Sequence, residues 1–273
     1  MTIKKVGLIG HPIAHSLSPT IHRHWLQVHA IEGLYNVYDI KPEGLSEFII
    51  KARVELTGFN VTVPHKESIL KYCDEVSDLA RLVGAVNTVK IENGKIYGDN
   101  TDVFGFATAL LENIKNKNKE LHKNKAVILG AGGACRAGII ALKQLGFDNI
   151  IIVNRTFKKA IKLANEFGVD AFEMKYLNKA LEDATLLVNT SIAGMNGDNI
   201  IDMDISKMHE DAIVYDIVYK PLQTDMLMRA KENNLCAIMG IDMLLYQAVS
   251  GFERWFGKAP TVDDILRQKV LGK

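Results

Sequence analysis

The sequence contains few cysteines, almost no net charge and no long apolar run. Cys73, Cys135 and Cys236 are odd in number and widely spaced, and no CxxC pair occurs. The 33 basic and 32 acidic side chains give a formal net charge of +1, which provides no overall field to attract nucleic acid or an anionic membrane. No uninterrupted apolar stretch approaches the roughly 18 residues of a membrane span. We therefore predict neither nucleic-acid nor membrane partners.

The motifs of hydrolases and metal enzymes are also missing. There is no HExxH, no Ser-His-Asp motif and no GxSxG elbow. Among the histidines, His11 and His15 are separated by Pro12, and His22 and His24 would point to different sides of a helix. We therefore predict no metal site. The first residues, MTIKKVGLIG, have the character of a strand and not of a signal peptide, which together with the cysteine pattern predicts a reduced, cytoplasmic protein.

The length and the order of patterns predict a two-domain α/β protein. At 273 residues with 48% apolar and 24% charged side chains, the chain exceeds one typical domain and can bury a substantial core. Strand-like runs alternate with helical patterns, which predicts parallel sheets with helices on both faces. The first unit has predicted strands at 6–10, 35–40, 59–63 and 86–98, a helix at 17–30 and a turn at Asn93-Gly94, and it ends near residue 102. The lysine-rich segment 115–125 is typical of a solvated connection to a second unit.

Two polar clusters in the first unit carry groups suited to proton transfer. NVTVPHK at 60–66 ends in Lys66, and GDNTD at 98–102 ends in Asp102. An ammonium group beside a carboxylate can pass a proton to and from a bound alcohol or ketone, while amides and hydroxyls fix a polyhydroxylated ring. The alternative is a structural ion pair. His65, next to Lys66, is predicted to face solvent.

The second unit begins with a pattern typical of a dinucleotide phosphate site. GAGGACRA at 130–137 follows the apolar run AVIL at 126–129 and precedes a helical pattern. Gly130 permits the tight turn after the strand, Gly132 lets the backbone approach a pyrophosphate, and Gly133 adds room. Cys135 replaces the third glycine of the fingerprint, so the motif alone is also compatible with an ordinary turn.

The end of the next strand indicates which dinucleotide is bound. NIIIV at 149–153 is followed by Arg155 and Thr156, where an NAD-specific site would have an acidic residue for the ribose hydroxyls. The guanidinium of Arg155, the Thr156 hydroxyl and the Lys159 ammonium can instead face a 2′-phosphate, which favours NADP. The alternative is that these cations form the solvated face of a helix.

Taken together, these motifs resemble the shikimate dehydrogenases, which use NADP to interconvert 3-dehydroshikimate and shikimate. The resemblance covers almost the whole chain through GHPIAHSLSPTIH (10–22), NVTVPHK, GAVNT (84–88), GDNTD, GAGGACRA, VNRT (153–156), VNTS (188–191), DIVY (216–219) and GIDMLLYQA (240–248). It implies a substrate-binding and catalytic domain at 1–102, completed by C-terminal helices at 241–273, and a Rossmann-type NADP-binding domain at 103–240.

The resemblance also implies roles for individual residues. Lys66 is the catalytic proton donor and acceptor, and Asp102 orients it. Ser16 and Ser18 hold the substrate carboxylate with support from Tyr219, although two serines before Pro19 are also typical of a helix cap and turn. The ring hydroxyls are contacted by Asn60, Thr62, Asn87 and Gln247. The implied NADP(H) contacts are Gly130, Ala131, Gly132, Gly133, Ala134, Asn154, Arg155, Thr156, Lys159, Thr190, Ile217, Gly240 and Met243.

Three positions depart from the family pattern. Cys135 stands where Ser is common, and Ser191 follows Asn189 and Thr190 where the family often has a second Thr. Asp242 stands where many members have Gly, so we expect it to alter loop geometry near the nicotinamide. Two alternative functions remain open: a dehydrogenase that also acts on quinate with NAD, and a non-catalytic nucleotide or metabolite sensor on the same fold. We expect a monomer or a homodimer.

Overall fold

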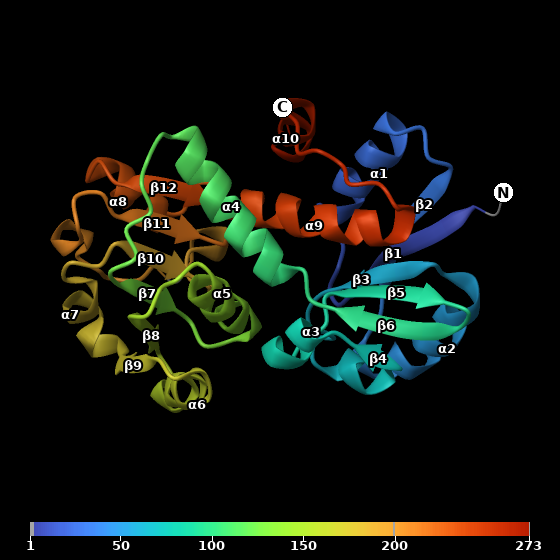
Figure 1. Cartoon of the computed structure of the whole chain (residues 1–273), viewed down its shortest axis with the longest axis horizontal. Coiled ribbons are helices and arrows are strands. Elements are labelled where there is room, and N and C mark those ends of the chain that lie inside the picture. The colour runs from blue at the N-terminus through green and yellow to red at the C-terminus, as the bar shows by residue number, and fades with distance from the viewer. Residues whose placement is uncertain (1–2, 199, 273) are drawn as a thin grey trace. The chain divides into compact units, whose positions relative to one another are not determined.

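The computed structural model describes residues 3–198 and 200–272 and has an α/β fold (Figure 1). The chain divides into two compact units, one formed by Met1–Asp102 with Leu245–Lys273 and the other by Val103–Leu244. Each unit contains one six-stranded sheet. The chain passes between the units within two long helices, α4 (Asp102–Asn116) and α9 (Gly240–Phe256). Across the described residues, no helix is both long and apolar enough to cross a membrane.

The sheet of the first unit has the strand order β2-β1-β3-β5-β6-β4. β1 pairs in parallel with β2 and β3, whereas β5 is antiparallel to β3 and β6. The strands are β1 (Lys4–Gly10), β2 (Gly33–Asp39), β3 (Gly58–Val61), β4 (Glu75–Val76), β5 (Thr88–Glu92) and β6 (Lys95–Asp99).

The β5–β6 hairpin makes this sheet mixed, whereas the alternation of strand and helix patterns predicted a parallel sheet. Asn93 and Gly94 connect the two strands, and a two-residue turn can join only antiparallel neighbours. Both residues have left-handed backbone angles, with φ of 52° and 76°. These are the angles that a tight hairpin turn requires, so the predicted turn is confirmed.

Helices cover both faces of the first sheet. On one face, α2 (Leu45–Glu55) packs Leu45, Phe48 and Ile49 against the buried side chains of β1, β3 and β5. On the other, Trp255 of α9 fills the space above Gly58, where an added Cβ would lie 2.3 Å from the indole nitrogen. The remaining helices of this unit are α1 (Ser18–Val28), α3 (Asp78–Val83) and α10 (Asp264–Val270).

The sheet of the second unit is parallel throughout, with the order β12-β11-β10-β7-β8-β9. Its strands are β7 (Ala126–Leu129), β8 (Ile150–Asn154), β9 (Asp170–Glu173), β10 (Leu186–Asn189), β11 (Ile213–Asp216) and β12 (Cys236–Met239). Four of them, β7, β8, β10 and β11, are apolar and almost fully buried, as expected for strands covered on both faces. Successive strands extend in one direction from β7 to β9 and in the other from β10 to β12. This places a topological switch point between β7 and β10, where ligands of open α/β sheets bind.

The helices of the second unit connect its parallel strands. They are α5 (Gly133–Gln144), α6 (Phe157–Phe167), α7 (Leu177–Leu181) and α8 (Asp225–Glu232). Most of α4 also belongs to this unit and leads into β7. α4 ends at Asn116, and residues 117–125 form neither helix nor strand and are largely exposed. The predicted solvated segment is therefore present, but it joins α4 to β7 within the second unit and does not connect the two units.

Candidate active site

Lys66 and Asp102 form a close ion pair in the first unit. Lys66 lies in the loop after β3, and its Nζ donates to Asp102 Oδ2 over 2.8 Å. Asp102 is the first residue of α4, where the free backbone N–H groups attract a negative charge. The Lys66 side chain is 31% exposed and that of Asp102 12% exposed. The ammonium is therefore anchored on one side and still accessible to a ligand.

Asn87 fixes the other oxygen of the Asp102 carboxylate. Its Nδ2 donates to Asp102 Oδ1 over 2.8 Å. Its Oδ1 accepts from the backbone N–H of Thr101 over 2.8 Å, and because a backbone N–H can only donate, this contact determines which end of the amide faces the carboxylate. The Asp102 backbone N–H donates to Asn100 Oδ1 over 2.9 Å. Asp102 is thus held by its side chain and by its main chain.

Asn60 and Gln247 belong to the same polar cluster. Asn60 and Asn87 are only 4% and 3% exposed, and Asn60 Nδ2 donates to the backbone carbonyl of Asn87 over 3.3 Å. Thr101 Oγ1 donates to Gln247 Oε1, which α9 supplies, over 3.4 Å. The structure therefore brings five predicted site residues into one hydrogen-bonded cluster: Lys66, Asp102, Asn87, Asn60 and Gln247. Thr101, which the sequence reading did not single out, joins them from within the GDNTD motif.

The remaining predicted residues of this unit lie at the same edge of the sheet. Because β1 and β3 are parallel neighbours, the segments after their carboxyl ends are adjacent, and Thr62 N donates to Ile9 O over 2.9 Å. Ser16 follows β1, and its Oγ accepts from Ser18 N over 3.3 Å at the start of α1. Ser16 thus has the turn-forming role that is the alternative for these serines, whereas neither serine caps α1 with its side chain.

His65 does not face solvent, so that prediction is wrong. Its side chain is 1% exposed, and its Nε2 lies 2.6 Å from the backbone carbonyl oxygen of Ile40. A carbonyl can only accept, so the Nε2 carries the proton. His65 therefore anchors the Lys66 loop to the segment after β2, a long-range contact that neighbouring residues in the sequence do not indicate.

In the second unit, the glycine-rich turn leaves open space above a helix N-terminus. Gly130 has a φ of 109°, and an added Cβ there would lie 2.8 Å from Thr190 Oγ1. At Gly132 and Gly133, in contrast, an added Cβ would meet no atom within 4 Å. The packing of the protein itself therefore requires Gly130 but not the other two. Their missing side chains keep the N-terminus of α5 clear, which suits the close approach of a phosphate group.

A cavity of about 310 Å³ lies at the switch point of the second sheet. Gly130 at the end of β7, Asn154 and Arg155 at the end of β8, and Ser191 after β10 all contribute to its lining. Asn154 Nδ2 donates to the backbone carbonyl of Thr156 over 2.9 Å, which shapes the turn into α6. Arg155, Thr156 and Lys159 are exposed, and the first turn of α6 has no acidic residue. The rim of this cavity therefore carries positive charge beside a helix N-terminus.

The other predicted cofactor contacts lie after strands β10 and β11 or at the start of α9 in the same unit. The Thr190 hydroxyl donates to Leu129 O over 2.7 Å and so ties β10 to β7. Gly240 begins α9, and an added Cβ there would lie 2.2 Å from the Ile217 carbonyl oxygen, so only glycine permits this approach. Met243 is buried. Tyr219, a predicted substrate residue, is half-buried, and burial raises the pKa of its hydroxyl.

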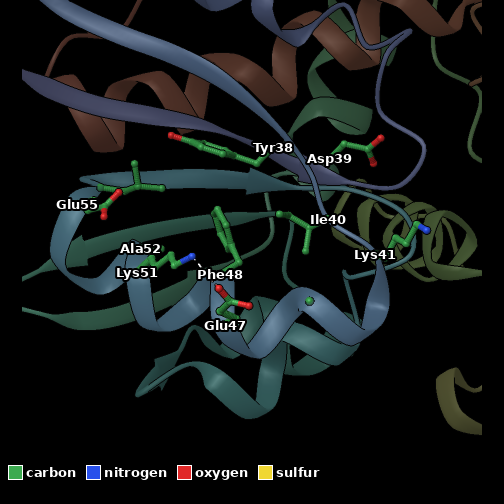
Figure 2. Close-up of a pocket in the computed structure, with 11 residues that line it drawn as sticks. Tyr38, Asp39, Ile40, Lys41, Glu47, Phe48, Lys51, Ala52 and Glu55 are labelled. Atoms are coloured by element: carbon green, nitrogen blue, oxygen red, sulfur yellow. Dashed lines mark hydrogen bonds and ion pairs between the residues drawn. The ribbon is translucent and has the colours of Figure 1, made fainter.

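A separate cavity in the first unit contains none of the predicted site residues (Figure 2). It lies between the end of β2 and α2 and has a volume of about 370 Å³, with Tyr38 and Phe48 among its apolar lining. Lys51 and Glu47 at its rim pair with each other, with 2.7 Å between Nζ and Oε1. Its size alone does not make it a candidate for catalysis.

Comparisons with known proteins identify the family of this chain. Residues 8–89 match the family model described as shikimate dehydrogenase substrate binding domain, residues 112–218 match shikimate / quinate 5-dehydrogenase, and residues 240–268 match the shikimate 5′-dehydrogenase C-terminal domain. The chain is 41% identical to the shikimate dehydrogenase (NADP(+)) of Ruegeria sp. (strain TM1040), with 98% of each chain covered. It is 44% identical to that of Mesorhizobium japonicum, with 98% of this chain and 96% of the relative covered.

The chain belongs to the shikimate dehydrogenase family.

Solved structures of the family have the same fold. The structure of the Thermus thermophilus shikimate 5-dehydrogenase in complex with NADP(H) and shikimate has a TM-score of 0.86 at 35% identity, with 98% of each chain covered. The quinate dehydrogenase of Corynebacterium glutamicum in complex with NAD has a TM-score of 0.89 at 28% identity, with 99% of each chain covered. The family resemblance and the α/β fold class predicted from the sequence are therefore confirmed.

Two of the departures from the shikimate dehydrogenase pattern, Cys135 and Asp242, have packing roles. Cys135 is fully buried in α5, and burial raises the pKa of its thiol to about 12, so it acts as a small apolar residue. Asp242 is also buried, and its Oδ2 accepts from Asn113 Nδ2 over 2.8 Å. Asp242 lies in the first turn of α9 and contacts α4. The expected change of a loop is wrong, because this segment is helical.

Proposed function

We propose that this protein is an NADP-dependent shikimate dehydrogenase that reversibly reduces 3-dehydroshikimate to shikimate. The single observation that carries the proposal is the Lys66–Asp102 pair of 2.8 Å, set among buried amides and next to polar groups at one sheet edge. A structural ion pair needs no exposed ammonium and no surrounding amide network. A proton donor for a polyhydroxylated ring needs both.

The residues of the second unit fit a bound NADP(H). The clear space above Gly132 and Gly133 and the N-terminus of α5 suit a pyrophosphate, and the cavity at the switch point suits the adenosine end. At the end of β8, Arg155 stands in place of the acid that NAD-specific sites use, with Thr156 and Lys159 nearby in sequence. The nicotinamide, when bound, supplies and accepts the hydride. Gly240 and Met243 at the start of α9 are assigned to its side of the site.

The residues of the first unit manage the proton and the substrate. In the reduction, the Lys66 ammonium donates a proton to the carbonyl oxygen at C3 as the hydride adds to the carbon; in the oxidation, the neutral amine takes the hydroxyl proton. Asp102 holds the amine in place and accepts from a neighbouring substrate hydroxyl. Ser16 and Ser18, supported by Tyr219, hold the carboxylate, while Asn60, Thr62, Asn87 and Gln247 contact the ring hydroxyls.

This proposal assigns substrate binding to residues 1–102 with the C-terminal helices and NADP binding to residues 103–240. It also includes a cytoplasmic location and a monomeric or homodimeric state, and light scattering of the purified protein distinguishes the two states. A quinate-oxidising activity with NAD is the second candidate, because the chain also resembles a quinate dehydrogenase in complex with NAD. The absence of an acid at 154–156 favours NADP over that alternative.

The decisive experiment follows the NADPH absorbance band in four reactions. Purified protein is mixed with shikimate or quinate, and with NADP or NAD. We expect the highest kcat/KM for shikimate with NADP. Comparable rates for quinate with NAD would favour the broader dehydrogenase. No turnover in any reaction, despite nucleotide binding by calorimetry, would favour a non-catalytic sensor and overturn the proposal.

A further inference from the structure

A buried chain of hydrogen bonds leads from Tyr35 to the Asp102 carboxylate. The Tyr35 hydroxyl donates to Asn60 Oδ1 over 2.8 Å, and Asn60 Nδ2 donates to Thr88 Oγ1 over 3.2 Å. Thr88 Oγ1 then donates to Asn87 Oδ1 over 3.0 Å, and Asn87 Nδ2 donates to Asp102 Oδ1 over 2.8 Å. Tyr35 and Thr88 are 2% and 1% exposed, so water does not compete for these groups.

Backbone groups determine the orientation of both amides in this hydrogen-bond chain. Asn60 Nδ2 also faces the backbone carbonyl of Asn87, which can only accept, so the amide nitrogen must lie on that side. Asn87 Oδ1 faces the backbone N–H of Thr101, which can only donate. Between these two amides, the Thr88 hydroxyl accepts from Asn60 and has its proton directed to Asn87 Oδ1 at 3.0 Å, the nearer of two acceptors, the other being Thr101 Oγ1 at 3.3 Å. With the proton on this shorter bond, all donors of the chain point toward the carboxylate.

Tyr35 is itself rigidly held at the start of the chain. Its ring stacks on His22 with 4.3 Å between centroids and 7° between planes, and its backbone carbonyl accepts from the Arg23 guanidinium over 2.9 Å. A ring fixed in this way cannot swing its hydroxyl away from Asn60. The fixed ring therefore holds Asn60 directly, and through Thr88 it helps to hold Asn87, the amide that contacts Asp102.

We propose that Thr88 and Tyr35 are positioning residues for the proton site, which hold Asn87 firmly in the orientation that the Thr101 N–H selects and so maintain the geometry of the Lys66–Asp102 pair. Neither belongs to the groups assigned above to substrate or cofactor. This inference rests on the proposed function, because it assigns Lys66 the proton step. Loss of the Thr88 hydroxyl leaves both amides in place but removes the hydrogen bonds that link Asn60 to Asn87. We therefore expect the transition state to be destabilised more than ground-state binding.

The test compares Thr88→Val, which keeps the shape, with Thr88→Ser, which keeps the hydroxyl. We expect kcat for shikimate oxidation to fall by about tenfold or more in Thr88→Val, with a smaller change in KM, and to recover to within about threefold in Thr88→Ser. Thr185→Val is the matched control, because Thr185 is also 1% exposed and its hydroxyl donates to His122 O in the second unit. It should lower the melting temperature without lowering kcat.

Tyr35→Phe removes the hydroxyl at the start of the series of hydrogen bonds. It replaces Thr88→Val as the test if that variant does not fold. We expect Tyr35→Phe to lower kcat. The double variant Tyr35→Phe with Thr88→Val should lower kcat no more than the more damaging single variant, because both changes interrupt the same series of hydrogen bonds. A kcat within about twofold of wild type in folded Thr88→Val or Tyr35→Phe, or losses that multiply, would overturn the inference.

A readout without turnover separates this inference from the proposed function. In protein labelled with ¹⁵N-asparagine, the Asn87 side-chain amide, assigned from its absence in Asn87→Ser, should shift and exchange faster with solvent in Thr88→Val and Tyr35→Phe but not in Thr185→Val. Unchanged Asn87 resonances would overturn the positioning role even in an active enzyme. An inactive wild type with the expected resonance changes would refute the catalytic proposal and leave the hydrogen-bond chain established.

Discussion

Lys66 Nζ lies 2.8 Å from Asp102 Oδ2, although 36 residues separate the two in sequence. One comes from the loop after β3 and the other from the first turn of α4. Two buried anchors hold them in place: His65 bonds to Ile40 O beside the lysine, and Asn87 bonds to the second carboxylate oxygen. The ammonium can therefore meet a substrate oxygen without reorganising its surroundings, which is the condition for efficient proton transfer.

Replacement of Lys66 should affect turnover more than binding. We expect Lys66→Ala to lower kcat by about 10² or more, with a much smaller change in KM for shikimate, because the proton moves only in the transition state. Asp102→Asn should also lower kcat, since it keeps the shape but removes the charge that orients the ammonium. Lys51→Ala is a control, because Lys51 is an exposed lysine that pairs with Glu47 in the same unit. A folded Lys66→Ala protein with near-normal kcat would remove the lysine from the mechanism.

The two serines near the end of β1 should determine affinity for the substrate carboxylate. We expect the double variant Ser16→Ala with Ser18→Ala to raise KM for shikimate, each lost bond to the charged group being worth roughly 1.5–3 kcal/mol. Ser16 also accepts from Ser18 N, so Ser16→Ala should lower the melting temperature slightly, whereas Ser206→Ala in the second unit should leave KM unchanged. Steady-state kinetics and thermal melts measure the two effects. An unchanged KM in the double variant would place the carboxylate elsewhere.

The cofactor preference should depend on Arg155. We expect Arg155→Ala to weaken NADP binding by about 1.5–3 kcal/mol and to leave NAD binding nearly unchanged, because NAD has no 2′-phosphate to lose. The ratio of the two affinities should therefore shrink by about tenfold or more, as measured by calorimetric titration. Lys119→Ala, at an exposed lysine that pairs with Asp211, is the control. Equal losses for both nucleotides would make Arg155 a structural residue or a platform for adenine.

Buried His22 should make the first unit sensitive to mild acid. Burial among aromatic rings lowers the pKa of His22 from 6.5 to about 3. Below about pH 6.5, His22 is protonated in the unfolded chain but stays neutral in the folded chain. The free energy of unfolding is therefore highest above pH 6.5 and decreases as the pH falls toward 3. We expect a loss of about 2 kcal/mol between about pH 6.5 and 5, measured by urea unfolding.

His22→Phe isolates this contribution, because it retains a stacking ring that does not titrate. Its stability should change less than that of the wild type between about pH 7 and 5, a range in which most carboxylates stay ionised. His15→Gln, at an exposed histidine, should keep the pH dependence of the wild type. Identical pH dependence in wild type and His22→Phe would show that His22 does not cause the acid sensitivity.

The sequence by itself determined the features that depend on local chemistry. The Asn93-Gly94 turn, the apolar strand β7 and the glycine-rich turn at Gly130 all follow from backbone angles and side-chain size within a few residues. Lys66 and Asp102 could also be singled out as candidates for proton transfer, because the two polar clusters end in a lysine and an aspartate. Thr88 was within reach as well, since it stands beside Asn87 in GAVNT.

Only the tertiary structure decided how those groups are oriented and buried. His65 is predicted from the sequence to lie at the surface, yet it is buried and bonds to the carbonyl of Ile40, 25 residues away. The role of Tyr35 depends on its meeting Asn60 across neighbouring elements, and nothing around Tyr35 in the sequence marks it. The end of the Asn87 amide that faces Asp102 is chosen by the Thr101 backbone, 14 residues later. Residue type sets what a group can donate or accept, but distant backbone atoms, brought close by the sheet, select which of those bonds forms.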